Sequence, residues 1–143
     1  MKMNVKQVLV WRTDLKNTDG HKVRSGKMAA QLAHASMAAI LADGEFDDIV
    51  YSENDVDHQL TLTLTPAMKY WLENSFTKVC VQVNSEQHLL DLYQQAVDAG
   101  IPCSLIKDNG TTEFGGVKTH TAVAIGPAEA SDIDNITGGL SLL

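Results

Sequence analysis

The chain alternates between short runs of β-forming residues and longer stretches whose apolar side chains recur at helical spacing. The β-rich runs predict strands over residues 8–11, 78–83, 103–106 and 121–125. The helical spacing predicts helices over residues 26–41, 67–74, 85–99 and 128–135. The predicted order along the chain is therefore strand, helix, helix, strand, helix, strand, strand, helix.

Local signals set the predicted ends of these segments. Ser25 is a candidate cap for the first helix, and Thr65-Pro66 suits the start of the second. Gly100 is expected to end the third helix, because glycine readily adopts the left-handed conformation found there. Gly126-Pro127 is expected to stop the last strand, since proline cannot donate a hydrogen bond to a neighbouring strand.

This order of elements predicts the fold class α/β, with three layers, α/β/α. Strands joined by helices are normally parallel neighbours, so we expect a small mixed sheet of about four strands covered by helices on both faces. The link between residues 106 and 121 contains no predicted helix, so the last strand is expected to run antiparallel. The 143 residues suit a single domain, 1–143, that is long enough to bury a core.

Composition narrows the class of protein. The hydrophobic fraction of 44% and the charged fraction of 20% are typical of a soluble globular protein. No apolar run approaches the roughly 18 residues of a membrane span, and the N-terminal apolar stretch is too short for a signal peptide. We therefore expect a cytoplasmic protein without membrane contact. Cys80 and Cys103 lie in apolar runs without a second ligand nearby, which favours two buried thiols over a zinc site.

The distribution of charge is uneven. Residues 1–42 hold seven Lys/Arg and two Asp/Glu, whereas residues 43–143 hold four Lys/Arg and sixteen Asp/Glu, for a total of −7. The total argues against a generic nucleic-acid-coating protein, but the basic N-terminal third suits contact with phosphate. The alternative is that this uneven distribution of charge has no functional role. The acidic segment 43–57 is expected to be a surface excursion with only weak structure.

The first predicted helix carries a polar row on an otherwise apolar sequence. Lys27, Gln31 and His34 are spaced i, i+4 and i+7, so they share one face. Lys27 also lies in the first turn, where the free N–H groups and the helix dipole favour an anion. This row is a candidate phosphate or oxyanion site. The alternative is a solvated helix face with a hydrogen-bonded His34.

A second candidate follows the third strand, where residues 108–112 read Asp-Asn-Gly-Thr-Thr. Ligands tend to bind at the carboxyl ends of strands in open sheets. Asp108 there can orient a water or a hydroxyl, and Thr112 can donate a hydrogen bond or act as a nucleophile beside a base. The alternative is a turn in which Asp108 only accepts backbone hydrogen bonds. The sequence contains no nucleophile elbow, P-loop, zinc motif or dinucleotide fingerprint.

Taken together and in order, these motifs resemble those of the archaeal and eukaryotic (type II) peptidyl-tRNA hydrolases. The most distinctive is GKMAAQLAHA at residues 26–35, which is very close to the family's Gly-Lys-x-Ala-Ala-Gln-x-x-His-Ala helix. The other matching segments are RTDL at 12–15, FTKVCVQV at 76–83, IKDNGTT at 106–112, TAVAIGP at 121–127 and ITGGL at 136–140.

The resemblance implies hydrolysis of the ester bond of peptidyl-tRNA, which releases free tRNA and peptide. It implies a four-stranded mixed sheet, no metal or other cofactor, and often a homodimer. The catalytic residues that it implies are Lys27, Asp108 and Thr112, and those that line the same region are Gln31, His34 and Thr121. From the basic N-terminal third we add Lys22 and Arg24 as candidate phosphate contacts for tRNA.

The chain also departs from the family pattern. The loop between residues 15 and 26 is longer than usual, the acidic segment 43–57 is unusual, and Glu113 stands where the family has a neutral amide. A carboxylate near tRNA phosphates is unfavourable because like charges repel. These departures keep two alternatives open. One is a family member without catalysis that binds a nucleotide, an RNA end or a protein, and the other is a hydrolase of small acyl esters.

Overall fold

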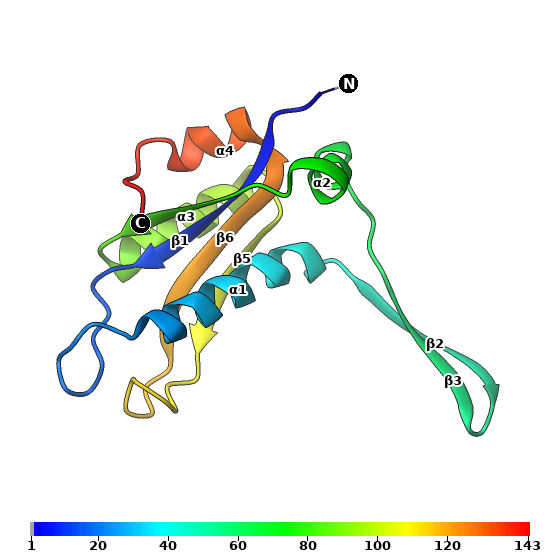
Figure 1. Cartoon of the computed structure of the whole chain (residues 1–143), viewed down its shortest axis with the longest axis horizontal. Coiled ribbons are helices and arrows are strands. Elements are labelled where there is room, and N and C mark those ends of the chain that lie inside the picture. Colours follow the sequence, from blue (N-terminus) through cyan, green and yellow to red (C-terminus); the bar gives the residue numbers. More distant parts are fainter. Residues whose placement is uncertain (1) are drawn as a thin grey trace.

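The computed structural model describes residues 2–143, and its main sheet has four strands in the order β4 (Lys78–Val83), β1 (Val5–Arg12), β6 (Thr119–Glu129) and β5 (Cys103–Asp108) (Figure 1). β1 and β4 are parallel, and β6 runs antiparallel to both of its neighbours. The mixed sheet and the antiparallel last strand are therefore confirmed.

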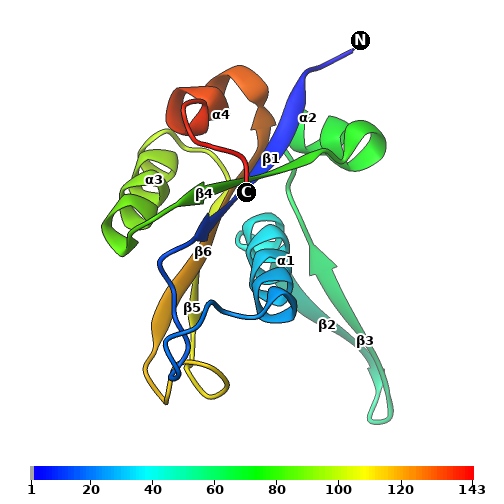
Figure 2. The same cartoon turned by 60° about the vertical axis from the view of Figure 1, so that its left-hand side comes forward.

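Helices cover both faces of this sheet. On one side lie α1 (Ser25–Leu41) and the short α2 (Pro66–Tyr70), which continues as a π-helical turn, Trp71–Ser75. On the other side lie α3 (Glu86–Asp98) and α4 (Ala130–Thr137) (Figure 2). Alternate residues of β1 serve the two sides: Val8 and Val10 pack with α3 and α4, and Leu9 and Trp11 pack with α1. The three-layer α/β/α prediction is confirmed.

The helix ends that were predicted from capping residues are only partly confirmed. Thr65 caps α2 by accepting a hydrogen bond from the Met68 N–H, and Gly100 takes a φ of 70° after α3, as predicted. Ser25 does not cap α1: it is the first residue of the helix, and the capping position is Arg24. The side chain that satisfies this helix end comes from a distant loop, as described below.

The prediction that Gly126-Pro127 stops the last strand is wrong, because β6 continues to Glu129. The pairing with β1 shifts here, so that residues 126 and 127 lie opposite Gln7 alone. Such a bulge tolerates a proline within a strand, because the ladder is already interrupted there. A side chain at Gly126, which has a φ of 102°, would lie 2.7 Å from the Lys6 carbonyl oxygen, so the bulge requires glycine.

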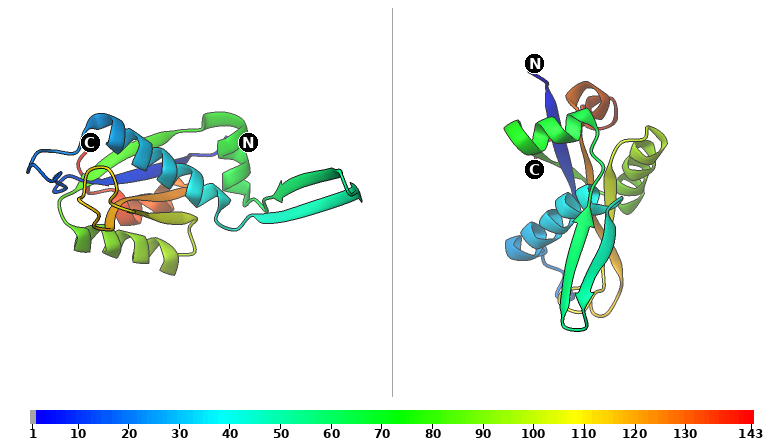
Figure 3. Two further views of the ribbon diagram at one scale, coloured as in Figure 1. Left: turned by 90° about the horizontal axis from the view of Figure 1, so that it is seen from below. Right: turned by 90° about the vertical axis from the view of Figure 1, so that its right-hand side faces the viewer.

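The prediction for segment 43–57 is confirmed for its exposure on the surface but wrong about its weak structure, because most of the segment forms a regular hairpin. β2 (Glu45–Ser52) pairs antiparallel with β3 (Asp55–Thr61). The hairpin follows the carboxyl end of α1 and projects away from the rest of the molecule (Figures 1 and 3). β2 reads Glu-Phe-Asp-Asp-Ile-Val-Tyr-Ser, so it mixes acidic and apolar residues without regular alternation, and all eight residues are exposed.

The two cysteines are free thiols and only half-buried, so the prediction of two buried thiols was too strong. Burial by its neighbours nevertheless raises the pKa of the Cys103 thiol, with the nearby Asp43 carboxylate adding to the shift. In the described part of the chain no helix has the length and apolar character to span a bilayer.

Candidate active site

The two polar motifs predicted from the sequence meet at one end of the sheet, where β5 finishes. We call this end of the strands the edge of the sheet. Lys27 in the first turn of α1 points its ammonium group at Asp108, the last residue of β5. Its Nζ donates to Asp108 Oδ1 at 2.8 Å and to Thr112 Oγ1 at 2.7 Å. Asp108 is buried, and the Lys27 side chain is 14% exposed, whereas Thr112 is open to solvent. The cation therefore lies between a buried carboxylate and an exposed hydroxyl.

Gln31 and Thr121 lie beneath this cluster and are buried. Gln31 Nε2 donates to Asp108 Oδ1 at 3.3 Å, and the Thr121 hydroxyl donates to Gln31 Oε1 at 2.6 Å. The Thr121 donor fixes which end of the Gln31 amide faces Asp108. Both residues therefore orient the carboxylate from below, and they do not reach the open surface of the site.

The Asp108 carboxylate is held in its charged form. Burial alone would raise its pKa, but the hydrogen bond from Lys27, the Gly110 N–H at 2.9 Å and the positive charges of Lys27 and His34 outweigh burial and lower the pKa below the usual range. Asp108 thus also makes the turn contact that the alternative interpretation proposed. It is ionised at neutral pH and serves as the counter-ion of Lys27.

Glu113 connects the loop that carries Thr112 to the start of α1. Its buried carboxylate accepts a hydrogen bond from Arg24 Nε at 2.5 Å and another from the Arg24 backbone N–H at 3.3 Å. The acidic group thus satisfies a free N–H at the helix N-terminus, where negative charge is favoured. Glu113 is therefore paired inside the protein and does not present a free carboxylate to a ligand.

The remaining sequence candidates lie around the cluster rather than in it. His34 is exposed and makes no hydrogen bond to another of the described residues, but its charge acts on Asp108. Lys22 is exposed in the loop before α1, where its backbone pairs with that of Lys16. Arg24 is exposed over most of its side chain, with Nε bound to Glu113. The structure brings Lys22 into no contact with Lys27.

Sequence reasoning assigned no role to Arg12, which organises the middle of the same edge. Its guanidinium binds both oxygens of Asp14, at 3.0 and 2.8 Å, and also reaches Glu86 Oε2 at 3.3 Å and the His120 carbonyl oxygen at 3.0 Å. These partners come from the loop after β1, the start of α3 and the start of β6. The motif at 12–15 was visible in the sequence, but its partners are far away along the chain.

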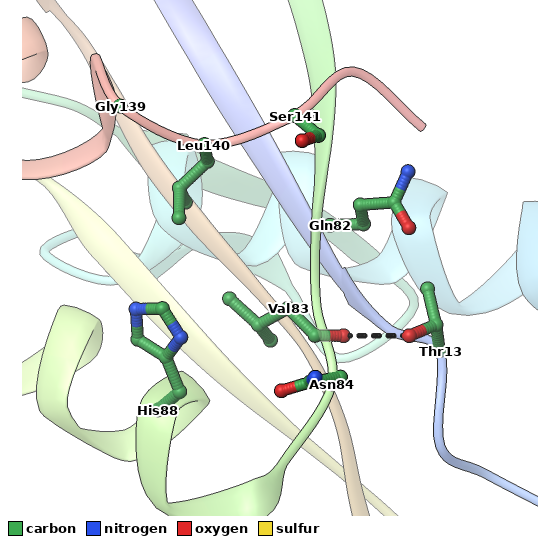
Figure 4. A pocket seen from close by; sticks show the side chains of 8 residues that line it. All are labelled: Thr13, Gln82, Val83, Asn84, His88, Gly139, Leu140 and Ser141. Carbon is green, nitrogen blue, oxygen red and sulfur yellow. Dashed lines mark hydrogen bonds between the residues drawn. The ribbon is translucent and has the colours of Figure 1, made fainter.

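Two hollows open at this edge. One, of about 300 Å³, lies between the loop after β1 and the loop after β5 and is lined by Arg12, Asp14, Lys16 and Phe114, among others. The other, of about 350 Å³, lies where β4 ends, and Figure 4 shows His88 and Leu140 on its walls. The two hollows share no lining residue, and neither is lined by Lys27, Asp108 or Thr112.

A largely buried lysine, a carboxylate of lowered pKa and an exposed hydroxyl at the open edge of an α/β sheet are typical of an enzyme site. The family comparison specifies the class: residues 5–143 match the model described as "Peptidyl-tRNA hydrolase PTH2". The chain belongs to this family, and the resemblance found in the sequence is confirmed.

Curated relatives are similar in sequence to this chain along nearly its whole length. A peptidyl-tRNA hydrolase of Methanocaldococcus jannaschii is 40% identical over 139 residues, covering 97% of this chain and 100% of the relative. One from Halobacterium salinarum is 38% identical over 138 residues, covering 96% and 99%. One from Sulfurisphaera tokodaii is 35% identical over 141 residues, covering 99% and 100%.

Proposed function

We propose that this chain, acting as a single domain over residues 1–143, hydrolyses the ester bond between a peptide and the 3′ ribose of tRNA. The observation that carries the proposal is the position of Lys27 Nζ, within hydrogen-bonding distance of both Asp108 and Thr112. The relatives from three archaea are all peptidyl-tRNA hydrolases, which supports this substrate. This activity belongs to translation and hence to the cytoplasm.

In the proposed reaction, water attacks the ester carbonyl carbon and the 3′ oxygen of the ribose leaves with a proton. Negative charge develops on the carbonyl oxygen, and Lys27 is the positive group that stabilises it. Thr112 accepts a hydrogen bond from Lys27, so its own proton is free to donate to the substrate.

Asp108 acts in this proposal by orientation. A carboxylate of lowered pKa is a weak base at neutral pH, so it suits holding Lys27 in place and aligning water better than removing a proton outright. Gln31 and Thr121 support it from the buried side, as positioning residues. His34 flanks the same surface.

The tRNA would lie along the loop before α1, where Lys16, Lys22 and Arg24 are exposed beside the catalytic cluster. Lys and Arg bind the phosphates of a nucleic acid and release its condensed counterions. Because Glu113 is buried against Arg24, its charge does not oppose this contact directly. The departure at position 113 is thus compatible with a polyanionic substrate.

The deciding experiment is turnover of purified peptidyl-tRNA with release of free tRNA, compared with a small N-blocked aminoacyl ester. The proposal expects hydrolysis that depends on the tRNA part. Hydrolysis of both substrates at equal efficiency would point to an esterase for small acyl groups. Binding of peptidyl-tRNA without turnover would instead favour the binding-module alternative.

A further inference from the structure

A third hollow, of about 240 Å³, opens at the same edge of the sheet and adjoins the other two. It shares Leu15 with the hollow beside Phe114 and Thr13 with the hollow of Figure 4. We call it the central hollow. Most of its lining residues are apolar: Trp11, Leu15, Val23, Met28 and Leu143. The polar ones are Thr13, Lys22 and Ser25. Apolar walls with a few polar groups are typical of a ligand site.

The central hollow and the catalytic cluster lie on two flanks of one helix turn. Ser25 and Met28 line the hollow, and Lys27 of the same turn directs its ammonium group at Asp108. The helix is about 10 Å wide with its side chains, which sets the distance across. The surface between is open, because a Cβ placed on Gly26 would meet no other part of the protein within 4 Å. A ligand bound at Lys27 can therefore extend over the start of α1 into the central hollow.

We propose that the central hollow binds a base of the unpaired 3′ end of the tRNA, and that this base carries an exocyclic amino group. The inference rests on the proposed function for the identity of the ligand. The ester lies at Lys27, and the strand runs back over the start of α1 towards the exposed Lys22. Single-stranded RNA is typically recognised through bases that leave the stack and are held by contacts and hydrogen bonds of their own.

The hydroxyl groups of the lining favour a base with an amino group. Thr13 Oγ1 donates to the Val83 carbonyl oxygen at 3.1 Å, so its proton is already used (Figure 4). Towards a ligand Thr13 is therefore an acceptor only. The Ser25 hydroxyl is exposed and can donate or accept. Adenine and cytosine offer an amino donor, whereas uracil has a carbonyl oxygen in its place. The hollow thus favours A or C over U.

The charge at the hollow favours RNA over the peptide part of the substrate. Lys22 belongs to the lining, and Lys16 and Arg24 are exposed on the same loop. A cation beside an apolar hollow suits a base inside and its phosphate outside, whereas the neutral backbone of a peptide gains nothing from it. The volume of about 240 Å³ is below the about 300–1,000 Å³ of sites for drug-sized ligands, which suits a single base.

The test uses a CCA trinucleotide whose acyl group is attached through an amide, so that the ligand resists hydrolysis. Its dissociation constant for the full chain is measured by calorimetry, with each base removed in turn. We expect one abasic position to weaken binding at least about tenfold, the scale of losing one bound base. At that position the deaminated base, uracil for cytosine or hypoxanthine for adenine, should weaken binding about threefold to tenfold, the scale of one neutral hydrogen bond.

Two neighbouring leucines provide matched variants. Leu143 lines the hollow, whereas Leu142 is 70% exposed and is not among its lining residues. Leu143→Ser should lower the ratio of the abasic to the natural dissociation constant at least about threefold, and Leu142→Ser should keep the wild-type ratio. Thr13→Val should lose the preference for the amino group, and Thr13→Ser should keep it. The Thr13 backbone N–H still donates to Val83 in both variants.

Equal dissociation constants for all the abasic ligands and the natural one would overturn the inference, as would equal effects of the two leucine variants. Binding that depends on the size of the acyl group and on no base would assign the hollow to the peptide, which also overturns it. Because the ligand is not turned over, these results are independent of catalysis. Base-dependent binding by a chain that does not hydrolyse peptidyl-tRNA would support the inference and overturn the proposed function.

Discussion

Lys27 and Asp108 form an ion pair of 2.8 Å between residues separated by 81 positions in the chain. The pair joins the first turn of α1 to the last residue of β5, so it fixes the helix on the sheet as well as a cation at the sheet edge. Because Asp108 is buried, the pair couples the stability of the fold to the chemistry of the site.

Removing one partner of this pair should cost more stability than removing both. Lys27→Met leaves a buried carboxylate without its counter-ion, and we expect a loss of about 2–4 kcal/mol in the free energy of unfolding. Lys27→Met/Asp108→Leu should recover part of that loss, since no charge remains uncompensated. Urea denaturation of the two single variants and the double variant measures the coupling. Additive losses would show that the pair does not act as a unit.

The lowered pKa of Asp108 makes the stability of the protein dependent on pH in the acid range. A carboxyl whose pKa is lower in the folded state stabilises the fold at pH values above its unfolded pKa of about 3.8. This contribution is lost as the pH falls from there through the folded value. Wild type should therefore lose stability below about pH 4 more steeply than Asp108→Asn in urea titrations. Parallel curves for the two proteins would contradict the shift.

Glu113 should act on the reaction through the position of its loop. Glu113→Ala frees the segment that carries Thr112, and we expect kcat to fall about tenfold or more, because small displacements of a reacting group are costly. Glu113→Gln should keep most of the activity, since an amide oxygen still accepts from the Arg24 N–H groups. Steady-state kinetics on peptidyl-tRNA distinguish the two. Equal activity of Glu113→Ala and wild type would show that Glu113 does not position the loop that carries Thr112.

Binding of tRNA should weaken with salt through the exposed lysines of the loop before α1. Replacing Lys16 and Lys22 by Ala should flatten the slope of log affinity against log salt by about one to two, at roughly 0.7–0.9 per phosphate contact. Hydrolysis of a minimal CCA ester should change little. These lysines are better probes than Arg24, whose loss would leave Glu113 without its partner. An unchanged slope would place the tRNA elsewhere on the surface.

Most of the fold could be predicted because its signals are local. Four strands and the main helices follow from residue periodicity, and the antiparallel last strand follows from a link in which no helix is predicted. The hairpin at 45–61 was missed because its first strand mixes apolar residues with acids without regular alternation, and clustered acids also characterise irregular loops. Gly126-Pro127 was wrongly predicted to end the last strand. The bulge opposite Gln7 that accommodates the proline depends on the pairing with β1, which the local sequence does not specify.

The candidate site was predictable in parts but not as a whole. Helical spacing places Lys27 and Gln31 on one face, and the end of a strand marks Asp108. Their contact depends on how α1 crosses the sheet. The link between Arg24 and Glu113 spans 89 positions, and an acid near a phosphate site suggests repulsion when its partner is unknown. Arg12 was in a visible motif, but its contacts to Glu86 and His120 exist only in the folded chain.

The most direct measurement for the central claim is single-turnover hydrolysis of peptidyl-tRNA by wild type, Lys27→Ala and the control Lys69→Ala, which alters an exposed lysine of α2. All three proteins are first shown to be folded by circular dichroism. The account predicts that Lys27→Ala lowers the rate at least about 100-fold, the scale of losing one oxyanion donor, and that Lys69→Ala keeps the wild-type rate. A Lys27→Ala rate close to that of wild type would contradict the assignment of the active site.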